Sequence, residues 1–240
     1  MTLHAEIETE PTAVPRPPSA RERAERIYRI LRDRICLLEY PPGSLISEEG
    51  LAQEFEVSRT PVRRVLARLE SEGLVQSVHG VGTLVTDPDI EELQQVYHLR
   101  LELALLIGKL TPTPWTREDI GRIRGLIARC DVDSSGSDQR AFLRLNLEFF
   151  NELNALTGNQ PLREISDRLY HLTARIWLNS VPRLNLRDEI EIFRREIADV
   201  ISALEIGDLE SVGHIRRSHI AMSFARLQRY GAAAHPAAKD

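Results

Sequence analysis

The sequence predicts a mainly α-helical protein in two parts, a small α+β head followed by a larger all-helical body. Three observations lead to this fold class. Apolar residues recur at steps of three and four along most of the chain, which is the period of an amphipathic helix. Only residues 74–78 and 83–86 are instead typical of strands, and they flank a glycine-containing turn. Residues 87–89, Asp-Pro-Asp, mark a boundary, and every segment after them is predicted to be helical.

Composition narrows the class of protein. The 240 residues are 42% hydrophobic and 28% charged, which is typical of globular proteins and excludes fibrous or wholly disordered chains. The net charge of −5 excludes a polycation that coats nucleic acid, so any basic surface must be local. No apolar run approaches the ~18 residues of a membrane span, and the acidic N-terminus is unlike a secretion signal. Two distant cysteines, Cys36 and Cys130, favour neither a disulfide scaffold nor a zinc site, and we expect a cytoplasmic protein.

The head is expected at residues 19–86, after an arm at 1–18 whose prolines and acidic residues predict disorder. Its first helix stops at the Pro-Pro-Gly of residues 41–43. Its second helix has Ser47 as N-cap. Its third is expected to begin with Thr60 as N-cap, followed by a proline at the first helical position.

Positive charge is concentrated on this third helix. Residues 57–69 contain four arginines and no acid, whereas residues 20–86 as a whole contain ten arginines and ten acidic residues. Guanidinium groups attract phosphates and pair with guanine edges, and short hydroxyls near a helix N-terminus suit phosphate oxygens. A merely solvated helix face is the alternative that charge alone leaves open.

Three helices followed by a two-stranded hairpin have the order of a winged helix-turn-helix, in which the second helix of the turn enters the DNA major groove. Glycines in the hairpin turn, the tip of the wing, allow close approach to the DNA backbone. The candidate DNA-binding residues from these patterns are Ser58, Arg59, Thr60, Arg63, Arg64 and Gly80.

The head resembles the DNA-binding domain of the GntR family of bacterial transcription regulators. The resemblance is carried by residues 51–63, LAQEFEVSRTPVR, by the glycine turn at 80–82 and by the upstream Pro42-Gly43. It implies a homodimer on a short palindromic operator, with base and phosphate contacts from the third helix and the wing. The implied contact residues are Ser58, Arg59, Thr60, Arg63, His79 and Gly80. The chain departs from the family pattern at Arg64, often a glutamate, and at Glu49, where some members place an arginine that contacts DNA.

The body is expected at residues 91–229, after a linker at 87–90 and before a disordered tail at 230–240. Its helices are predicted at roughly 90–110, 116–130, 138–157, 161–180, 187–206 and 208–229. This part resembles the FCD effector domain, named after the C-terminal part of the fatty-acid regulator FadR. The matching residues are Arg100, Asn146, Phe149, Leu153, Gly158, Asn159, Leu162, Ala203, Gly207, Asp208 and His219.

The FCD resemblance implies an all-α antiparallel helical bundle around a ligand cavity, and many members hold a divalent metal there with an aspartate and three histidines. This sequence has Asn146, Phe150 and Ile197 at three of those positions and keeps only His219. One imidazole and one neutral amide are poor ligands for a divalent ion, so no metal cofactor is expected. Phe150 and Ile197 would make the cavity more apolar.

Arg100 is the one charge in an apolar stripe of its helix, and no acidic residue lies three or four positions away. A buried, unpaired guanidinium is costly, so an anionic partner is expected. The alternatives are a carboxylate from another helix, exposure of the guanidinium to solvent, or the carboxylate or phosphate of a ligand. His219 is either a ligand contact or a core residue with its hydrogen bonds satisfied. The candidate effector-binding residues are Arg100, Asn146, Phe150, Ile197 and His219.

These patterns and the resemblance predict a DNA-binding transcription regulator whose operator affinity is controlled by a small organic acid such as an acyl or aromatic carboxylate. The resemblance implies a repressor by default, because most members of the GntR family repress. An enzyme is not expected, because none of the common nucleophile, zinc-protease, phosphate-loop or dinucleotide motifs is present. Two alternatives stay open: a constitutive DNA-binding protein with a closed body, and a regulator with a metal-dependent effector site.

Overall fold

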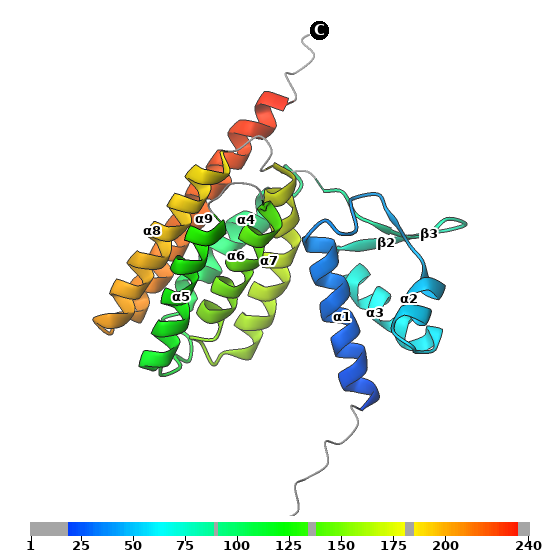
Figure 1. The fold of residues 1–240 in the computed structure, drawn as a ribbon, viewed down its shortest axis with the longest axis horizontal. Coiled ribbons are helices and arrows are strands. Elements are labelled where there is room, and N and C mark those ends of the chain that lie inside the picture. Colours follow the sequence, from blue (N-terminus) through cyan, green and yellow to red (C-terminus); the bar gives the residue numbers. More distant parts are fainter. Residues whose placement is uncertain (1–18, 89–90, 134–137, 181–184, 235–240) are drawn as a thin grey trace, which may run out of the picture.

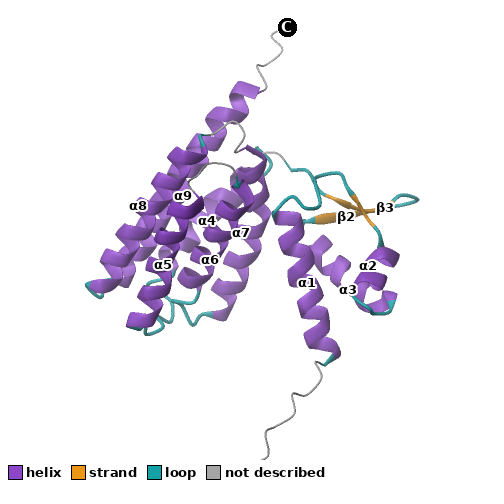
Figure 2. Cartoon of the chain, viewed as in Figure 1, coloured by secondary structure: helices purple, strands orange, loops and turns teal. Residues whose placement is uncertain are grey.

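The computed structural model describes residues 19–88, 91–133, 138–180 and 185–234. Within these ranges the chain forms a head with a small sheet and a body of helices only, as the sequence predicts (Figures 1 and 2). The expected arm at 1–18 lies outside the described residues. In the part of the chain that is described, no helix has the length and apolar character needed to cross a membrane.

Three helices and three short strands make up the head. A capping box starts the first helix: Ser19 accepts a hydrogen bond from the backbone of Glu22, whose carboxylate accepts one from the backbone of Ser19. The apolar faces of the three helices close over the sheet and form one core, which includes Leu31, Val62 and Leu69. The elements are α1 (Ala20–Cys36), β1 (Leu45–Ile46), α2 (Glu48–Glu54), α3 (Arg59–Ser71), β2 (Val75–Val78) and β3 (Gly82–Val85).

The sheet is antiparallel, in the order β1-β3-β2. The sequence predicted only the hairpin of β2 and β3. The additional strand β1 has two residues, Leu45 paired with Leu84 and Ile46 with Thr83, and two residues are too few to show alternation. It forms because the Pro-Pro-Gly turn returns the chain to the edge of β3, where Gly43 N–H donates to the carbonyl of Val85.

The start of α3 differs from the prediction by two residues. The helix begins at Arg59 with Ser58 as N-cap, not at Pro61 with Thr60 as N-cap. Pro61 is therefore the third helical residue, and its missing N–H is still one of the first four that have no partner inside the helix. Thr60 consequently lies within the first turn, and its hydroxyl is not needed as a cap.

The described residues of the body form six long helices. They are α4 (Gln94–Leu106), α5 (Arg117–Asp133), α6 (Gln139–Asn154), α7 (Gln160–Ser180), α8 (Leu186–Glu205) and α9 (Leu209–Ala234). The first is shorter than the predicted 90–110 because the chain turns after Leu106, and α9 continues to Ala234, beyond the predicted end at 229. The helices run side by side (Figure 1) around an aromatic core in which Phe193 meets Phe142 and Phe149 edge to face.

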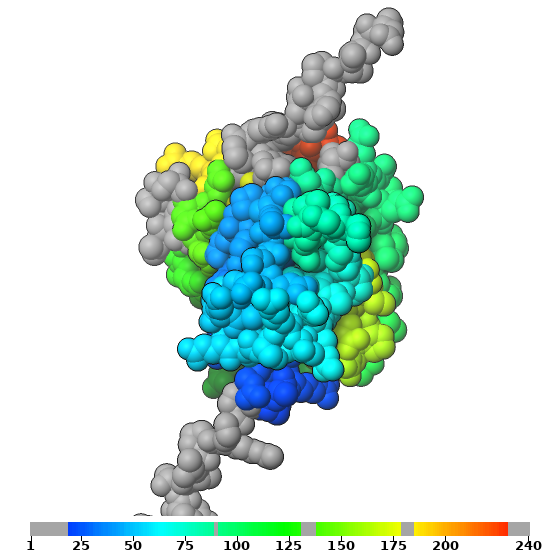
Figure 3. Space-filling model, turned by 90° about the vertical axis from the view of Figure 1, so that its right-hand side faces the viewer, coloured from blue at the N-terminus to red at the C-terminus, as the bar shows by residue number. Residues whose placement is uncertain are grey.

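The head packs on the body through α1 and α7, and α1 stands between α7 and the rest of the head (Figure 1). Arg32 of α1 pairs with Asp167 of α7 at 2.5 Å. Leu37, at the end of α1, joins an apolar cluster with Leu143, Phe150 and Tyr170 of the body. Seen from the side of the head, α1, α2 and the wing lie in front of the body (Figure 3).

Candidate functional site

The predicted DNA-binding residues are all exposed. Five belong to the N-cap and the first turns of α3, and two to the turn between β2 and β3. The β2–β3 hairpin and α2 lie on the side of the head away from the body (Figure 1), so the body does not cover them. The residues are Ser58, Arg59, Thr60, Arg63 and Arg64 on α3, and His79 and Gly80 in the wing turn.

The fourth arginine of this segment, Arg68, has a structural role instead. Its guanidinium carbon lies 3.4 Å from the centroid of the Tyr28 ring, and it pairs with Glu25 at 2.8 Å and Glu72 at 3.2 Å. Arg68 therefore ties α3 to α1.

Two glutamates of α2 hold two of the exposed arginines. Glu48 pairs with Nε of Arg63 at 2.7 Å, and Glu49 with Nη2 of Arg59 at 3.0 Å. Arg64 is exposed and takes part in none of the ion pairs recorded among the described residues. Among the described ion pairs, the α3 surface therefore has one uncommitted guanidinium, that of Arg64, and two that are paired with carboxylates.

The wing is fixed to α3 by Glu70, whose carboxylate accepts hydrogen bonds from the backbone N–H of Ser77 at 2.6 Å and from its hydroxyl at 3.1 Å. Its turn needs glycine at two positions. Gly80 has φ +76° and Gly82 φ +125°, and a Cβ on Gly82 would lie 2.9 Å from Leu45. A glycine turn attached to the recognition helix can approach a DNA backbone closely.

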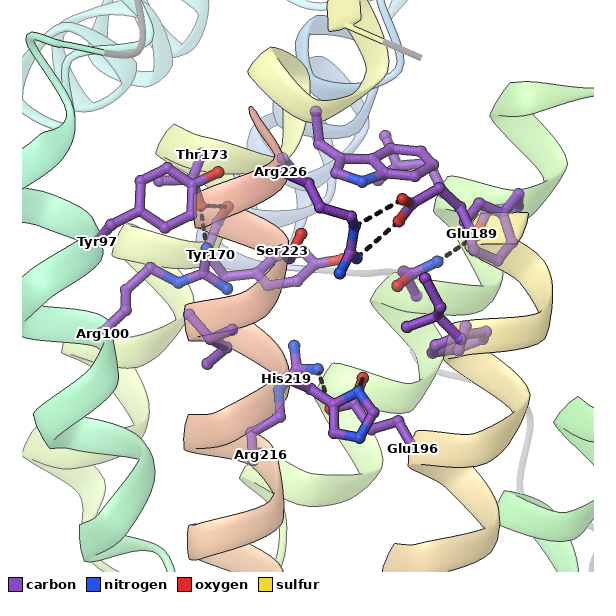
Figure 4. Close-up of a pocket in the computed structure, with 18 residues that line it drawn as sticks. Tyr97, Arg100, Tyr170, Thr173, Glu189, Glu196, Arg216, His219, Ser223 and Arg226 are labelled. Carbon is purple, nitrogen blue, oxygen red and sulfur yellow. Dashed lines mark hydrogen bonds and ion pairs between the residues drawn. The ribbon is translucent and has the colours of Figure 1, made fainter. Parts of the chain in front are cut away.

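The body encloses a cavity of about 90 Å³ between α4, α6, α7, α8 and α9 (Figure 4). Its wall is aromatic and aliphatic, with a few charged groups pointing inward. The lining residues include Tyr97, Arg100, Phe142, Asn146, Tyr170, Thr173, Trp177, Glu189, Phe193, Glu196, Arg216, His219, Ser223 and Arg226.

Arg100 points into this cavity without a carboxylate partner. Its Nη1 donates to the hydroxyl of Thr173 at 2.5 Å, and its guanidinium lies over the rings of Tyr97 and Tyr170, 5.4 and 5.5 Å from their centroids. Burial lowers the pKa of Arg100, but a guanidinium stays protonated at neutral pH. Of the three alternatives for its partner, a carboxylate from another helix is not found within ion-pair distance among the described residues, and a hydroxyl and two aromatic faces contact the guanidinium instead.

The other charges of the cavity are paired. Glu189 accepts two hydrogen bonds from Arg226, at 2.7 and 2.9 Å, and Glu196 pairs with Arg216 at 2.6 Å. Of the described residues that line the cavity, three are arginines and two are glutamates. These arginines and glutamates leave one positive charge in excess, and it lies at Arg100.

Two further polar groups that the sequence predicts at the cavity line it, Asn146 and His219. Asn146 donates from Nδ2 to the carbonyl of Phe142 at 2.9 Å. His219 lies 3.8 Å from the carboxylate of Glu196, and its buried Nδ1 has no hydrogen-bond partner among the described residues. A buried polar atom without a partner can be satisfied by a ligand or a bound water.

Phe150 and Ile197 were also expected at this cavity, and the structure places both outside its lining. Phe150 stacks on Tyr170 with ring centroids 4.2 Å apart and lines a smaller neighbouring cavity. Ile197 follows Glu196, and one residue turns the direction of a helical side chain by about 100°. It is fully buried in the core with Phe149 and Val200.

Sequence reasoning missed both ion pairs of the cavity. The signal was present on α9, where polar residues at 216, 219, 223 and 226 recur at steps of three and four and so share one face. On α8, Glu189 and Glu196 are seven apart and share a face in the same way. Each ion pair joins α8 to α9, and neither helix alone reveals it.

A divalent metal does not fit the residues at the family's metal positions. Phe150 and Ile197 have no donor atom, and among the described residues no group of three or more histidine, cysteine, aspartate or glutamate side chains is placed to hold an ion. Asn146 and His219 alone fall short of the three or more protein ligands that such ions usually take.

An exposed arginine helix with a wing, joined to a bundle with a charged cavity, defines a DNA-binding protein with a sensory domain. Residues 23–85 match the model for bacterial regulatory proteins of the gntR family, and residues 95–222 match the FCD domain. The chain belongs to the GntR family of bacterial transcription regulators and carries an FCD effector-binding domain. The predicted class is confirmed, and this family consists of regulators rather than enzymes.

Similar proteins agree with this class. An HTH-type transcriptional regulator of Streptomyces ambofaciens is 28% identical over 88% of this chain and 87% of its own length. One of Mycobacterium tuberculosis is 31% identical over 63% of this chain and 68% of its own. Among solved structures, Escherichia coli McbR/YncC has a TM-score of 0.72 at 20% identity, over 86% of this chain and 97% of its own. This likeness shows the shared fold.

Proposed function

We propose that the protein is a homodimeric repressor that binds a short palindromic operator, and that a small monocarboxylic acid bound in the cavity of the body controls its operator affinity. The observation that carries the ligand class is Arg100, a guanidinium in the cavity with a hydroxyl and two rings as partners. Such a fork binds a carboxylate or a phosphate through two parallel hydrogen bonds, and the small cavity favours the carboxylate.

The charges of the cavity favour a ligand with one negative charge. Glu189 and Glu196 already neutralise Arg226 and Arg216, so a monoanion at Arg100 leaves the cavity neutral. A dianion would leave one negative charge without a partner in a site of low polarity, which is costly.

The walls favour a short apolar part. Phe142, Trp177 and Phe193 line the cavity beside its polar groups. Its volume of about 90 Å³ is below the ~150 Å³ of an engineered cavity that binds benzene. A short acyl chain fits this size better than a long fatty acid, a single ring needs the side chains of the wall to move apart, and Asn146 and His219 can orient the ligand.

Repression is supported by the description of a relative, and dimerisation by the geometry of a palindromic operator. A protein of Paenarthrobacter nicotinovorans, 25% identical over 75% of this chain and 78% of its own length, is described as a probable D-xylose utilization operon transcriptional repressor. Two heads related by a twofold axis match two half-sites of a palindrome, and a change in their separation releases DNA.

Thermal unfolding tests the ligand class, with benzoate, butyrate and the uncharged benzamide as probes. We expect benzoate or butyrate, but not benzamide, to raise the melting temperature. Arg100→Met should weaken binding about tenfold or more, because a hydrogen bond to a charged group contributes about 1.5–3 kcal/mol. Arg117→Met, on the exposed side of α5, is the control. Unchanged binding by Arg100→Met would refute the assignment, and native mass spectrometry reports the dimer.

A further inference from the structure

Arg175 is a buried guanidinium at the junction of body and head, and it is not part of the cavity. It projects from α7 and is 2% exposed, and its hydrogen bonds among the described residues all go to groups of the head. Its Nη2 donates to the hydroxyl of Thr86 at 2.6 Å, and its Nη1 to the carbonyl of Thr86 at 2.8 Å. Longer contacts reach the carbonyls of Gly73 at 3.4 Å and Leu74 at 3.5 Å.

These acceptors lie where the recognition helix and the wing meet. Gly73 and Leu74 connect α3 to β2, and Thr86 follows β3. Thr86 itself joins the two segments, because its N–H donates to the carbonyl of Leu74 at 3.1 Å and its hydroxyl to the carbonyl of Gly73 at 2.7 Å. One guanidinium fork therefore holds both DNA-contacting elements at the point where they leave the body.

No carboxylate lies within ion-pair distance of Arg175 in the described part of the chain, and burial lowers the pKa of its guanidinium. A buried charge satisfied only by neutral carbonyls and a hydroxyl is costly. An apolar side chain of similar size would hold head and body together with a smaller free-energy penalty for burial. The arrangement instead fixes direction, because a planar fork accepts few orientations of its partners.

The same turn of α7 forms part of the cavity wall. Thr173 accepts the hydrogen bond of Arg100, and Ala174 and Trp177 also line the cavity. Residues two apart on a helix point about 200° away from each other, so Thr173 faces the cavity and Arg175 the head. A ligand carboxylate that takes Arg100 away from Thr173 acts on the helix that holds the head.

We propose that Arg175 is a positioning residue for DNA binding: it sets the orientation of the head on α7 and transmits ligand binding from Thr173 to α3 and the wing. The first half stands on the hydrogen bonds of Arg175 alone. The second half rests on the proposed ligand site at Arg100.

The orientation of the head is measured without a ligand by electron–electron double resonance between nitroxides at Gln53→Cys and Glu118→Cys. Both sites are exposed, whereas the natural Cys36 and Cys130 are buried. Labelled protein is diluted with unlabelled protein, so that the distance within one chain dominates. We expect one narrow distance distribution for the natural side chain at 175, and a clearly broader one for Arg175→Gln.

DNA binding by the same variants separates positioning from folding. On an operator selected in vitro, Arg175→Gln should bind about tenfold more weakly, within the usual range of coupling between sites. On a duplex with one half-site its affinity should be unchanged, because each head still folds. Thr86→Val, which removes the hydroxyl from the head side, should have the same effect and add nothing to Arg175→Gln.

The matched control is Arg168→Gln. Arg168 is on the same helix and also donates to a carbonyl of the head, that of Ser71 at 2.8 Å, but it is exposed. The Arg168→Gln substitution should leave both the distance distribution and the operator affinity unchanged. The proposal is wrong if Arg175→Gln keeps the narrow distribution, or if it loses half-site and operator binding equally.

Benzoate tests the second half. In the unmodified protein benzoate should weaken operator binding. The Arg175→Gln variant should bind benzoate equally well, but benzoate should not change the operator affinity that this variant retains. If Arg175→Gln still responds to benzoate, transmission through this residue is refuted. If benzoate does not bind the unmodified protein, the ligand class proposed above fails and transmission from the cavity fails with it. The distance and half-site measurements then decide the positioning role on their own.

Discussion

Glu49 of α2 forms an ion pair with Arg59, the first residue of the recognition helix, with Oε2 and Nη2 3.0 Å apart and both side chains more than half exposed. An exposed pair of this kind contributes little to stability. Its consequence is for DNA binding, because Arg59 must leave Glu49 before it can contact a phosphate or a base, and the carboxylate repels the phosphates nearby.

Glu49→Gln should therefore raise the affinity for DNA of any sequence. It should also steepen the salt dependence by about one unit of slope, as expected for one more phosphate contact. Fluorescence anisotropy with a non-operator duplex at several salt concentrations measures both quantities.

Glu54→Gln is the control for this prediction. Glu54 is also on α2 and exposed, but it pairs at 2.5 Å with Arg34 of α1, which is not among the candidate DNA-binding residues. Glu54→Gln should change neither the affinity for the non-operator duplex nor its salt dependence. Equal effects of the two variants would mean that overall charge, and not the release of Arg59, controls the affinity.

The ion pair between Glu196 and Arg216 makes a prediction about stability. Both side chains are buried, 7% and 10% exposed. Arg216→Met leaves the Glu196 carboxylate without its partner and should lower the free energy of unfolding by about 3–5 kcal/mol. Replacing both, as Glu196→Gln with Arg216→Met, should restore much of the loss. Urea unfolding of the three proteins measures this, and a double variant no more stable than Arg216→Met would contradict the role of the pair.

The order of elements and the recognition surface could be predicted from the sequence because both depend on local pattern. The arginines of residues 57–69 lie opposite an apolar stripe, and helical periodicity alone places them in solvent. Arg100 was identified in the same way, as a charge in an apolar stripe. Its acceptor Thr173 was not, because that partner is 73 residues away in sequence.

The cavity illustrates the limit of this reasoning. Phe150 and Ile197 were assigned to the cavity because of their positions in the family pattern, and neither lines it. A shift of one position along a helix turns the side chain by about 100°, so a pattern position alone does not determine which neighbour a side chain contacts. The Arg175 contacts were also missed. Carbonyl acceptors have no sequence signature, and a single arginine in a helix is indistinguishable from a solvated one until the fold brings the head against it.

His171 predicts a pH dependence of stability. It is 1% exposed, and burial lowers its pKa from 6.5 to about 3. Below pH 6.5 the unfolded chain binds a proton that the folded protein does not. The free energy of unfolding should therefore fall by up to about 1.4 kcal/mol per pH unit between pH 6.5 and 3 on account of this residue. Above pH 6.5 its contribution is constant.

Urea unfolding at pH 7.5 and 5.0 measures the effect, and His171→Phe isolates it. The pKa values of Asp33 and Asp167 are raised by burial, so these carboxyls act in the opposite direction, but both are present in the two proteins. The stability of His171→Phe should fall less on acidification than that of the unmodified protein. Identical losses would show that His171 is protonated in the folded state.

Gly213 allows α9 to pack closely against α4, and a side chain at this position should disturb that contact. A Cβ at this position would lie 2.8 Å from the carbonyl oxygen of Ala104, which is backbone and cannot turn away. Gly213→Ala should therefore separate the two helices and lower the free energy of unfolding by about 1–3 kcal/mol, even though alanine is the better helix former. Because α4 carries Arg100 and α9 carries His219, benzoate binding should weaken as well.

Gly121→Ala is the matched control in α5, where an added Cβ would meet nothing within 4 Å. It should stabilise the protein by up to about 1 kcal/mol through helix propensity alone and leave benzoate binding unchanged. Urea unfolding of the two variants should thus give stability changes of opposite sign for the same chemical change, and a benzoate titration should show a loss of affinity for Gly213→Ala alone. A stabilising Gly213→Ala would mean that α4 and α9 yield to the methyl group without loss of packing, and the cavity would then tolerate more movement between its walls than their backbone contact implies.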